Sequence, residues 1–81
     1  MSTPDRIRNI IVNDLAWAGA PDDLTIDYAL IDNDVLDSLG IYQMVTMIQD
    51  EFAIEIDDLE LVPENFETIG AMSRLVDSKV S

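Results

Sequence analysis

The sequence contains no cysteine and no histidine, and only four of its 81 residues are Lys or Arg. Without cysteine the chain can form neither a disulfide nor a thiolate nucleophile. Without histidine it can build no Ser-His-Asp triad and no His-ligated zinc site. Because 17 residues are Asp or Glu, the formal net charge is −13. A surface this acidic repels phosphate groups, so we expect the chain to bind neither nucleic acid nor an anionic membrane.

Long apolar runs are also missing. No run approaches the ~18 residues that a membrane span needs, and the Met-Ser-Thr-Pro-Asp-Arg start lacks the apolar core of a secretory signal. Yet 48% of the residues are hydrophobic, whereas acidic disordered chains have few hydrophobic residues. We therefore expect a single folded domain over residues 1–81, cytoplasmic and monomeric, with a small core.

Apolar residues recur at helical spacing in three segments, and helix-start signals precede each segment. The predicted helices cover residues 4–18, 38–52 and 69–79, with a short one at 57–61. Their expected N-caps, for the three longer helices, are Thr3, Asp37 and Thr68. This pattern predicts an all-α fold: a small four-helix bundle of three main helices plus one short helix, with a long loop between helices 1 and 2.

The long loop carries a weak strand signal. Leu24, Ile26, Tyr28 and Leu30 alternate with polar or small residues, and a similar alternation follows residue 52. A two-stranded ribbon between the two segments is therefore an alternative. Because a lone ribbon is only marginally stable, we favour extended segments whose apolar side chains hold the loop against the helices.

Two kinds of acidic site can be set aside. Asp32-Asn33-Asp34 resembles the start of a calcium-binding loop, but the sixth position is Asp37 instead of Gly and the twelfth is Gln43 instead of Glu. We therefore expect no metal site. Nothing indicates a pair of carboxylates held in a pocket, and so small a chain leaves little room for one. We expect no catalytic residues, and the chain is not predicted to be an enzyme.

The pair Asp37-Ser38 at the start of the second helix is more informative. A serine at a helix start most often only caps the helix, but here Asp37 fills that role better. Ser38 then takes the first helical position, where its hydroxyl can face solvent. The free N–H groups and positive end of a helix favour a phosphate at this place. The Ser38 hydroxyl therefore suits a phosphate ester better than hydrolytic catalysis, for which the chain offers no base.

The surrounding sequence resembles a known family. The relevant stretches are Asp34-Val35-Leu36-Asp37-Ser38-Leu39, Gln49-Asp50-Glu51-Phe52 and Ile54-Glu55-Ile56, followed by Thr68. A bare Asp-Ser-Leu triplet is common, but this one follows a long loop and precedes a helix in a small acidic chain. With this spacing the sequence, up to about Val76, is similar to acyl carrier proteins and the related peptidyl carrier proteins.

The resemblance implies a carrier of acyl or aminoacyl intermediates. In that family the serine of the motif receives a 4′-phosphopantetheine arm from coenzyme A, and the arm's thiol holds the cargo as a thioester. Carried over, Ser38 is the attachment residue and Asp37 supports loading. The implied partners are a phosphopantetheinyl transferase, an acyl- or aminoacyl-loading enzyme and downstream synthase enzymes with basic docking patches. The arm would supply the thiol that the chain lacks.

The second helix also suggests a docking face for these enzymes. Its expected partner-binding residues are Leu39, Tyr42, Met47, Asp50 and Glu51. The three apolar ones lie off the stripe that faces the core, and the two acids offer charge to basic surfaces. Tyr42 and Met47 fit equally well as core residues covered by the loop.

Departures from the family pattern bear on the pathway. Gly40 and Gln43 stand where carriers for fatty-acid synthesis usually have acids, and residues 61–66 look more like discrete carriers of polyketide, nonribosomal-peptide or other specialised pathways. The resemblance therefore favours a free-standing specialised carrier over one for standard fatty acid biosynthesis. The alternative from a different class is a cofactor-free acidic helical protein-interaction module that binds a basic partner.

Overall fold

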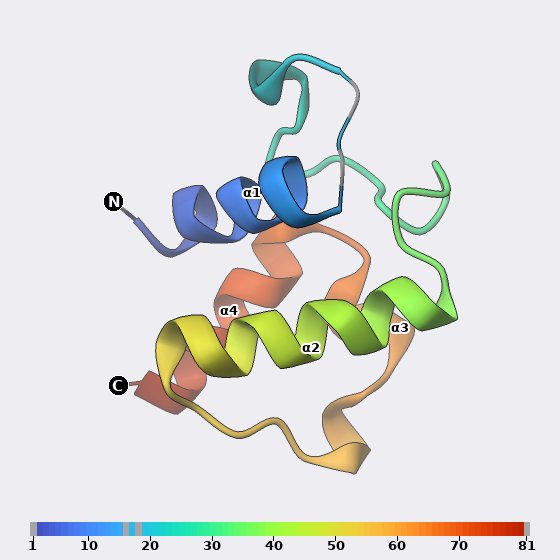
Figure 1. Ribbon diagram of the computed structural model, residues 1–81. Coiled ribbons are helices and arrows are strands. Elements are labelled where there is room, and N and C mark those ends of the chain that lie inside the picture. The colour runs from blue at the N-terminus through green and yellow to red at the C-terminus, as the bar shows by residue number, and fades with distance from the viewer. Residues whose placement is uncertain (1, 16, 18, 81) are drawn as a thin grey trace.

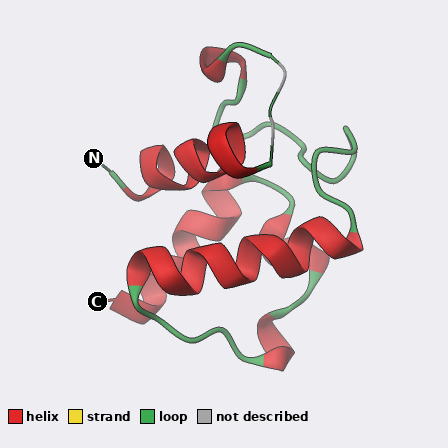
Figure 2. Cartoon of the chain, viewed as in Figure 1, coloured by secondary structure: helices red, strands yellow, loops and turns green. Residues whose placement is uncertain are grey.

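A computed structural model describes residues 2–15, 17 and 19–80. All regular elements in this part of the chain are helical, and Figure 2 shows no strand there. In chain order they are α1 (Thr3–Asp14), the 3₁₀ turn η1 (Pro21–Asp23), α2 (Ser38–Phe52), the 3₁₀ turn η2 (Asp58–Glu60), α3 (Pro63–Phe66) and α4 (Ile69–Val80). The predicted all-α fold is confirmed, and the alternative two-stranded ribbon is wrong.

The three longer helices each turn one apolar stripe inward, as their spacing predicts. The core side chains from these stripes are Ile7, Ile10, Ile11, Met44, Val45, Ile48, Ile69, Met72 and Val76. Phe66 of α3 is fully buried among them. Figure 1 shows α4 behind α1 and α2. α1 packs chiefly against α4, whereas α1 and α2 meet over a small area.

The start of α1 differs from the prediction by one residue. Its N-cap is Ser2, whose hydroxyl accepts a hydrogen bond from the backbone N–H of Asp5 at 3.4 Å. The predicted cap, Thr3, is therefore wrong, because Thr3 already lies inside the helix. Pro4 still occupies the first turn, where its missing N–H costs nothing.

The end of α1 comes earlier than the predicted residue 18. Leu15 leaves the helical region of backbone space, with φ −102° and ψ 12°. Trp17 lies beyond the helix, where its indole N–H donates to the carbonyl of Ala20 at 3.0 Å and its ring meets Tyr28 edge-on at 5.5 Å. Ala18, predicted to face the core, falls outside the described residues.

The segment after α2 also departs from the prediction. The short helix expected at 57–61 is a single 3₁₀ turn, η2, and a further short helix, α3, follows it. Pro63 begins α3 instead of only ending the element before it, which suits a residue with no N–H to leave unpaired. The prediction for α4 is confirmed at its start, because the Thr68 hydroxyl accepts the N–H of Ala71 at 3.0 Å.

Three buried leucines hold the long loop between α1 and α2 against the helices: Leu24, Leu30 and Leu36. Backbone hydrogen bonds add to this, since the N–H of Leu30 donates to the Glu67 carbonyl at 2.8 Å and the N–H of Gly70 donates to the Ile26 carbonyl at 3.0 Å. Ile26 itself is exposed, so the alternation that suggested a strand does not describe the loop. The loop is instead bound to the start of α4.

A salt bridge ties η2 to the C-terminal end of α4. The Glu60 carboxylate binds the ammonium of Lys79 and also accepts the backbone N–H of Asp57 at 3.0 Å. The hydrogen bond from Lys79, and then that from Asp57, hold the pKa of Glu60 below its usual 4.5. The same pairing raises the pKa of Lys79 above 10.5. The segment that connects α2 to α3 is therefore fixed at its middle.

We expect Ala53→Gly to stabilise the protein. Ala53 ends α2 in the left-handed region, with φ 54° and ψ 48°, where a Cβ is unfavourable and glycine is not. The free energy of unfolding should rise by about 0.5–1 kcal/mol, measured by urea denaturation. Gln43→Gly, at an exposed interior position of the same helix, should lower it by a similar amount. A loss of stability in Ala53→Gly would contradict this account of the helix end.

In the acid range, the free energy of unfolding of Glu60→Gln should depend less on pH than that of the wild type. A carboxyl whose folded pKa lies below its unfolded one adds stability above the unfolded value of 4.5, and this is lost as the pH falls through the folded pKa. The urea midpoint of Glu60→Gln should lie below that of the wild type at pH 7, and the gap should narrow below pH 4.5. Lys79→Met should show the same narrowing; a gap constant with pH would refute the pairing.

Candidate functional site

Ser38 is the first residue of α2, and its neighbour Asp37 caps the helix. Asp37 has extended backbone, its carboxylate Oδ1 accepts the N–H of Gly40 at 2.7 Å, and its carbonyl accepts the N–H of Ile41 at 2.8 Å. Ser38 is exposed, and within the described part of the chain its hydroxyl has no hydrogen-bond partner. Within the described structure the hydroxyl of this exposed residue is therefore not engaged.

The end of the long loop fixes the position of the start of α2 relative to the core. The carbonyl of Leu30 accepts two backbone hydrogen bonds, from Val35 at 2.8 Å and from Leu36 at 3.1 Å, which closes the loop on itself. Leu36 is then buried only two residues before Ser38. Since Leu30 is also hydrogen-bonded to the segment between α3 and α4, the position of Ser38 is set by the core and not by a free loop.

The electrostatics of this helix start favour an anion. The first N–H groups of α2 point outward, and the helix dipole adds partial positive charge. The first turn of α2 carries no acidic residue, so on this helix the start bears one acid, the cap Asp37; Asp14 of α1 lines the neighbouring hollow. One of the Asp37 oxygens is occupied by the cap hydrogen bond. The site can therefore hold a phosphate ester on Ser38 despite the acidic surface around it.

Two surface hollows flank Ser38. One, of about 150 Å³, is lined by Ser38, Ile41, Tyr42, Leu61 and Pro63, so it lies between α2 and the segment that follows η2. The other, of about 330 Å³, lies on the α1 side and is lined by residues that include Asp37, Leu39 and Gly40. Ser38 thus lies at the edge of a small, mainly apolar hollow.

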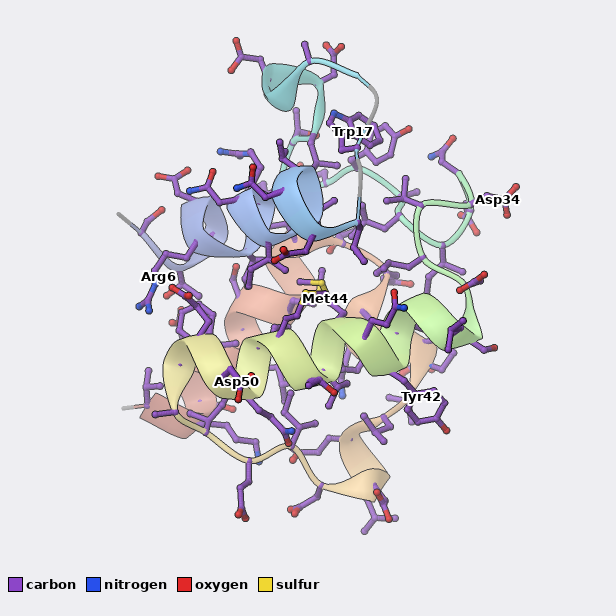
Figure 3. All side chains as sticks on the ribbon, in the orientation of Figure 1. Arg6, Trp17, Asp34, Tyr42, Met44 and Asp50 are labelled. Atoms are coloured by element: carbon purple, nitrogen blue, oxygen red, sulfur yellow. The ribbon has the colours of Figure 1, made fainter. Side chains whose placement is uncertain are left out.

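The predicted docking residues divide into two groups. Leu39 (66% exposed), Tyr42 (62% exposed) and Asp50 all lie on the exposed side of α2, and Figure 3 shows Tyr42 and Asp50 outside the space between the helices. Met47 is half-buried and packs against the core. Glu51 is exposed but bound to Arg6, whose guanidinium lies 2.8 Å from its carboxylate. Leu39, Tyr42 and Asp50 are therefore open on the surface, with Leu39 and Tyr42 near the start of α2 and Asp50 near its end, whereas Glu51 is exposed but paired.

Sequence reasoning missed the opposite wall of the small hollow. Leu61 and Pro63 are far from Ser38 in sequence, yet they line the same hollow as its hydroxyl. The available signal was the apolar run at residues 61–63, which follows an acidic turn and has no place in a helical stripe. Without the arrangement of α2 and α3 in space, nothing connected that run to Ser38.

Comparisons with known proteins agree with this geometry. A family model described as "Phosphopantetheine attachment site" matches residues 5–76. Acyl carrier proteins of Chlamydia trachomatis serovars D and A are each 27% identical over 79 residues, covering 98% of this chain and 97% of theirs. A chain from a solved structure described as "Crystal structure of FAD-dependent dehydrogenase" is 31% identical, with a TM-score of 0.74, over 86% of this chain and 97% of that one.

The family model covers well over half of the chain, and the relatives match it almost end to end. The described part contains no helix long and apolar enough to cross a membrane. Members of the family are carriers that interact with modifying and synthase enzymes, and their cofactor is phosphopantetheine. This chain belongs to the phosphopantetheine-attachment family of carrier proteins.

Proposed function

We propose that this chain is an acyl carrier protein, that Ser38 is its attachment residue for 4′-phosphopantetheine, and that it carries acyl or aminoacyl intermediates as thioesters. The observation that carries the proposal is the exposed hydroxyl of Ser38, which has no partner in the described structure because Asp37 caps α2 in its place. A serine that capped its own helix would have its oxygen engaged in that bond.

The residues around Ser38 fit the group that the family attaches. The open start of α2 favours the phosphate charge, and the apolar hollow formed with Tyr42 and Leu61 offers contact to the first atoms beyond it. When bound, the arm supplies a thiol, a group that this cysteine-free chain lacks. The chain itself presents the hydroxyl and the docking surface. Because no side chain of the described structure hydrogen-bonds to the hydroxyl as a base would, we propose that the chain is no enzyme and that a separate transferase performs the loading.

The proposed partners are that transferase, an acyl- or aminoacyl-loading enzyme and downstream synthase enzymes. Leu39, Tyr42 and Asp50 form the exposed side of α2 that we propose they contact. With a net charge of −13, the chain should be drawn to basic patches, which raises encounter rates more than affinity. Use of Glu51 would require its ion pair with Arg6 to open. The net charge of −13 opposes self-association, which supports a monomer. We also propose a cytoplasmic location.

The pathway is the finer question. One solved structure that this chain matches is described as that of an FAD-dependent dehydrogenase, and the matched chain is about as short as this one, since 86% of this chain covers 97% of it. We therefore propose a flavin-dependent dehydrogenase of a specialised pathway as one downstream enzyme. Expression in the native host and the mass of the ejected arm would show the cargo, and a loss of two hydrogens after incubation with such an enzyme would support this step.

Loading at Ser38 can be tested by intact-mass measurement. Incubation with coenzyme A, magnesium and a broad-specificity phosphopantetheinyl transferase should add the mass of one phosphopantetheine to the wild type and nothing to Ser38→Ala. Because Ser38 is exposed and is not the cap, the variant should unfold at nearly the wild-type urea concentration. If the wild type gains no mass, or if Ser38→Ala gains it equally, the chain is not a carrier loaded at this residue.

The proposed role of Asp37 in loading is separable from its role as helix cap. Asparagine caps a helix about as well as aspartate, so Asp37→Asn should keep the hydrogen bond to Gly40 and the stability of the protein. The asparagine lacks the negative charge of Asp37, so it cannot make the charge-assisted contact that we propose the carboxylate makes during loading. Such a contact is worth about 1.5–3 kcal/mol. The kcat/KM of loading should then fall by about 10- to 100-fold. Loading of Asp37→Asn at the wild-type rate would mean that Asp37 only caps.

A further inference from the structure

One apolar side chain stands apart from the rest of the surface. Leu59, at the middle of η2, is 92% exposed, the highest value among the large hydrophobic residues in the described part of the chain. Single exposed apolar residues are ordinary on protein surfaces. Leu59 differs from these because its backbone is held firmly and because it stands two residues before Leu61, which lines the Ser38 hollow.

Several interactions fix the backbone on both sides of Leu59. The carbonyl of Asp57 accepts the N–H of Glu60 at 2.8 Å, and the Glu60 side chain accepts the N–H of Asp57 at 3.0 Å. The Asn65 side chain donates to the carbonyl of Glu60 at 2.8 Å, and Lys79 binds the Glu60 carboxylate. None of these contacts involves the Leu59 side chain. The turn is thus rigidly built, while the leucine at its centre contributes little to the core.

The chain leads from this turn directly to the attachment site. Leu61, two residues after Leu59, lines the same hollow as Ser38 and Tyr42. Figure 3 shows Tyr42 on the side of α2 that faces the segment after that helix. Val62, next in sequence, is also exposed (38%). Leu59, Leu61 and Val62 thus form an apolar strip along the sequence between η2 and the Ser38 hollow.

The charge around the strip limits what can cover it. Four exposed acids flank it in sequence: Glu55, Asp57, Asp58 and Glu64. A second copy of this chain would bring the same acids and a further charge of −13 against it, so self-association is opposed. The complementary occupant is an enzyme surface with an apolar socket ringed by Lys or Arg.

The short distance between the Ser38 hydroxyl and the backbone indicates which enzyme this is. Downstream enzymes meet the thiol at the end of a long arm, whereas the enzyme that esterifies Ser38 must approach a hydroxyl one carbon from the backbone. That enzyme has to cover the hollow whose walls include Leu61 and Pro63. Given the proposed function, on which this inference rests, we propose that Leu59 is a docking anchor for the phosphopantetheinyl transferase, seated in an apolar socket with a basic rim.

The test compares loading kinetics of surface variants. Leu59→Ser should raise the KM of a broad-specificity phosphopantetheinyl transferase for the carrier by about 10-fold, with kcat unchanged. This is the loss of affinity expected when docking no longer buries a leucine side chain. Leu59→Met should restore most of the KM, because it keeps an apolar side chain. The matched control is Val80→Ser, an exposed apolar residue at the end of α4 (54% exposed), which should load like the wild type.

The outcomes separate this inference from the proposed function. If the wild type is loaded and Leu59→Ser shows the wild-type KM, the Leu59 anchor is refuted while the carrier role stands. If Leu59→Met is as poor as Leu59→Ser, or Val80→Ser is equally impaired, apolar docking at Leu59 is refuted as well. Asp58→Lys should raise the KM, more at low salt than at high salt, whereas Asp22→Lys in η1 should not. Failure of the wild type to load refutes the proposed function itself.

Discussion

The hydrogen bond from the Gly40 N–H to the Asp37 carboxylate is the interaction on which the attachment site depends. It determines the residue at which α2 begins, and therefore which side chain occupies the first helical position. Because Asp37 makes this bond, the oxygen of Ser38 is left unengaged at the positive end of the helix. A shift of the helix start by one residue would turn the serine into the cap and remove it from reaction.

Three of the four basic residues, Arg6, Arg8 and Lys79, link one element of the fold to another. Arg6 joins the start of α1 to the end of α2: it donates to the Glu51 carboxylate and carbonyl, and its guanidinium lies 4.3 Å from the centre of the Phe52 ring. Arg8 donates to the carbonyl of Leu24 in the long loop. Lys79 holds η2. Each pair at the surface is weak alone, but together they engage three of the four basic side chains and leave most of the acids without a basic partner.

The sequence predicted those features that depend on local pattern. The bounds of α2, the cap at Asp37 and the exposed hydroxyl of Ser38 follow from helical spacing and helix-terminus chemistry, and all three are found. α3 was missed because a four-residue helix shows no periodicity. The pairing of Glu60 with Lys79, and the meeting of Leu61 with the Ser38 hollow, join segments distant in sequence. Such contacts are set by packing and leave no local signal.

Because the long loop passes close to the start of α4, the residue at Gly70 affects the position of the attachment site from a distance. A Cβ at this position would lie 3.2 Å from the carbonyl oxygen of Ile26, tighter than most such contacts. Any larger residue would therefore push away a segment whose far end sets the beginning of α2. The amino acids tolerated at Gly70 are restricted by how accurately a carrier must present its serine, even though Gly70 lines neither of the hollows that flank Ser38.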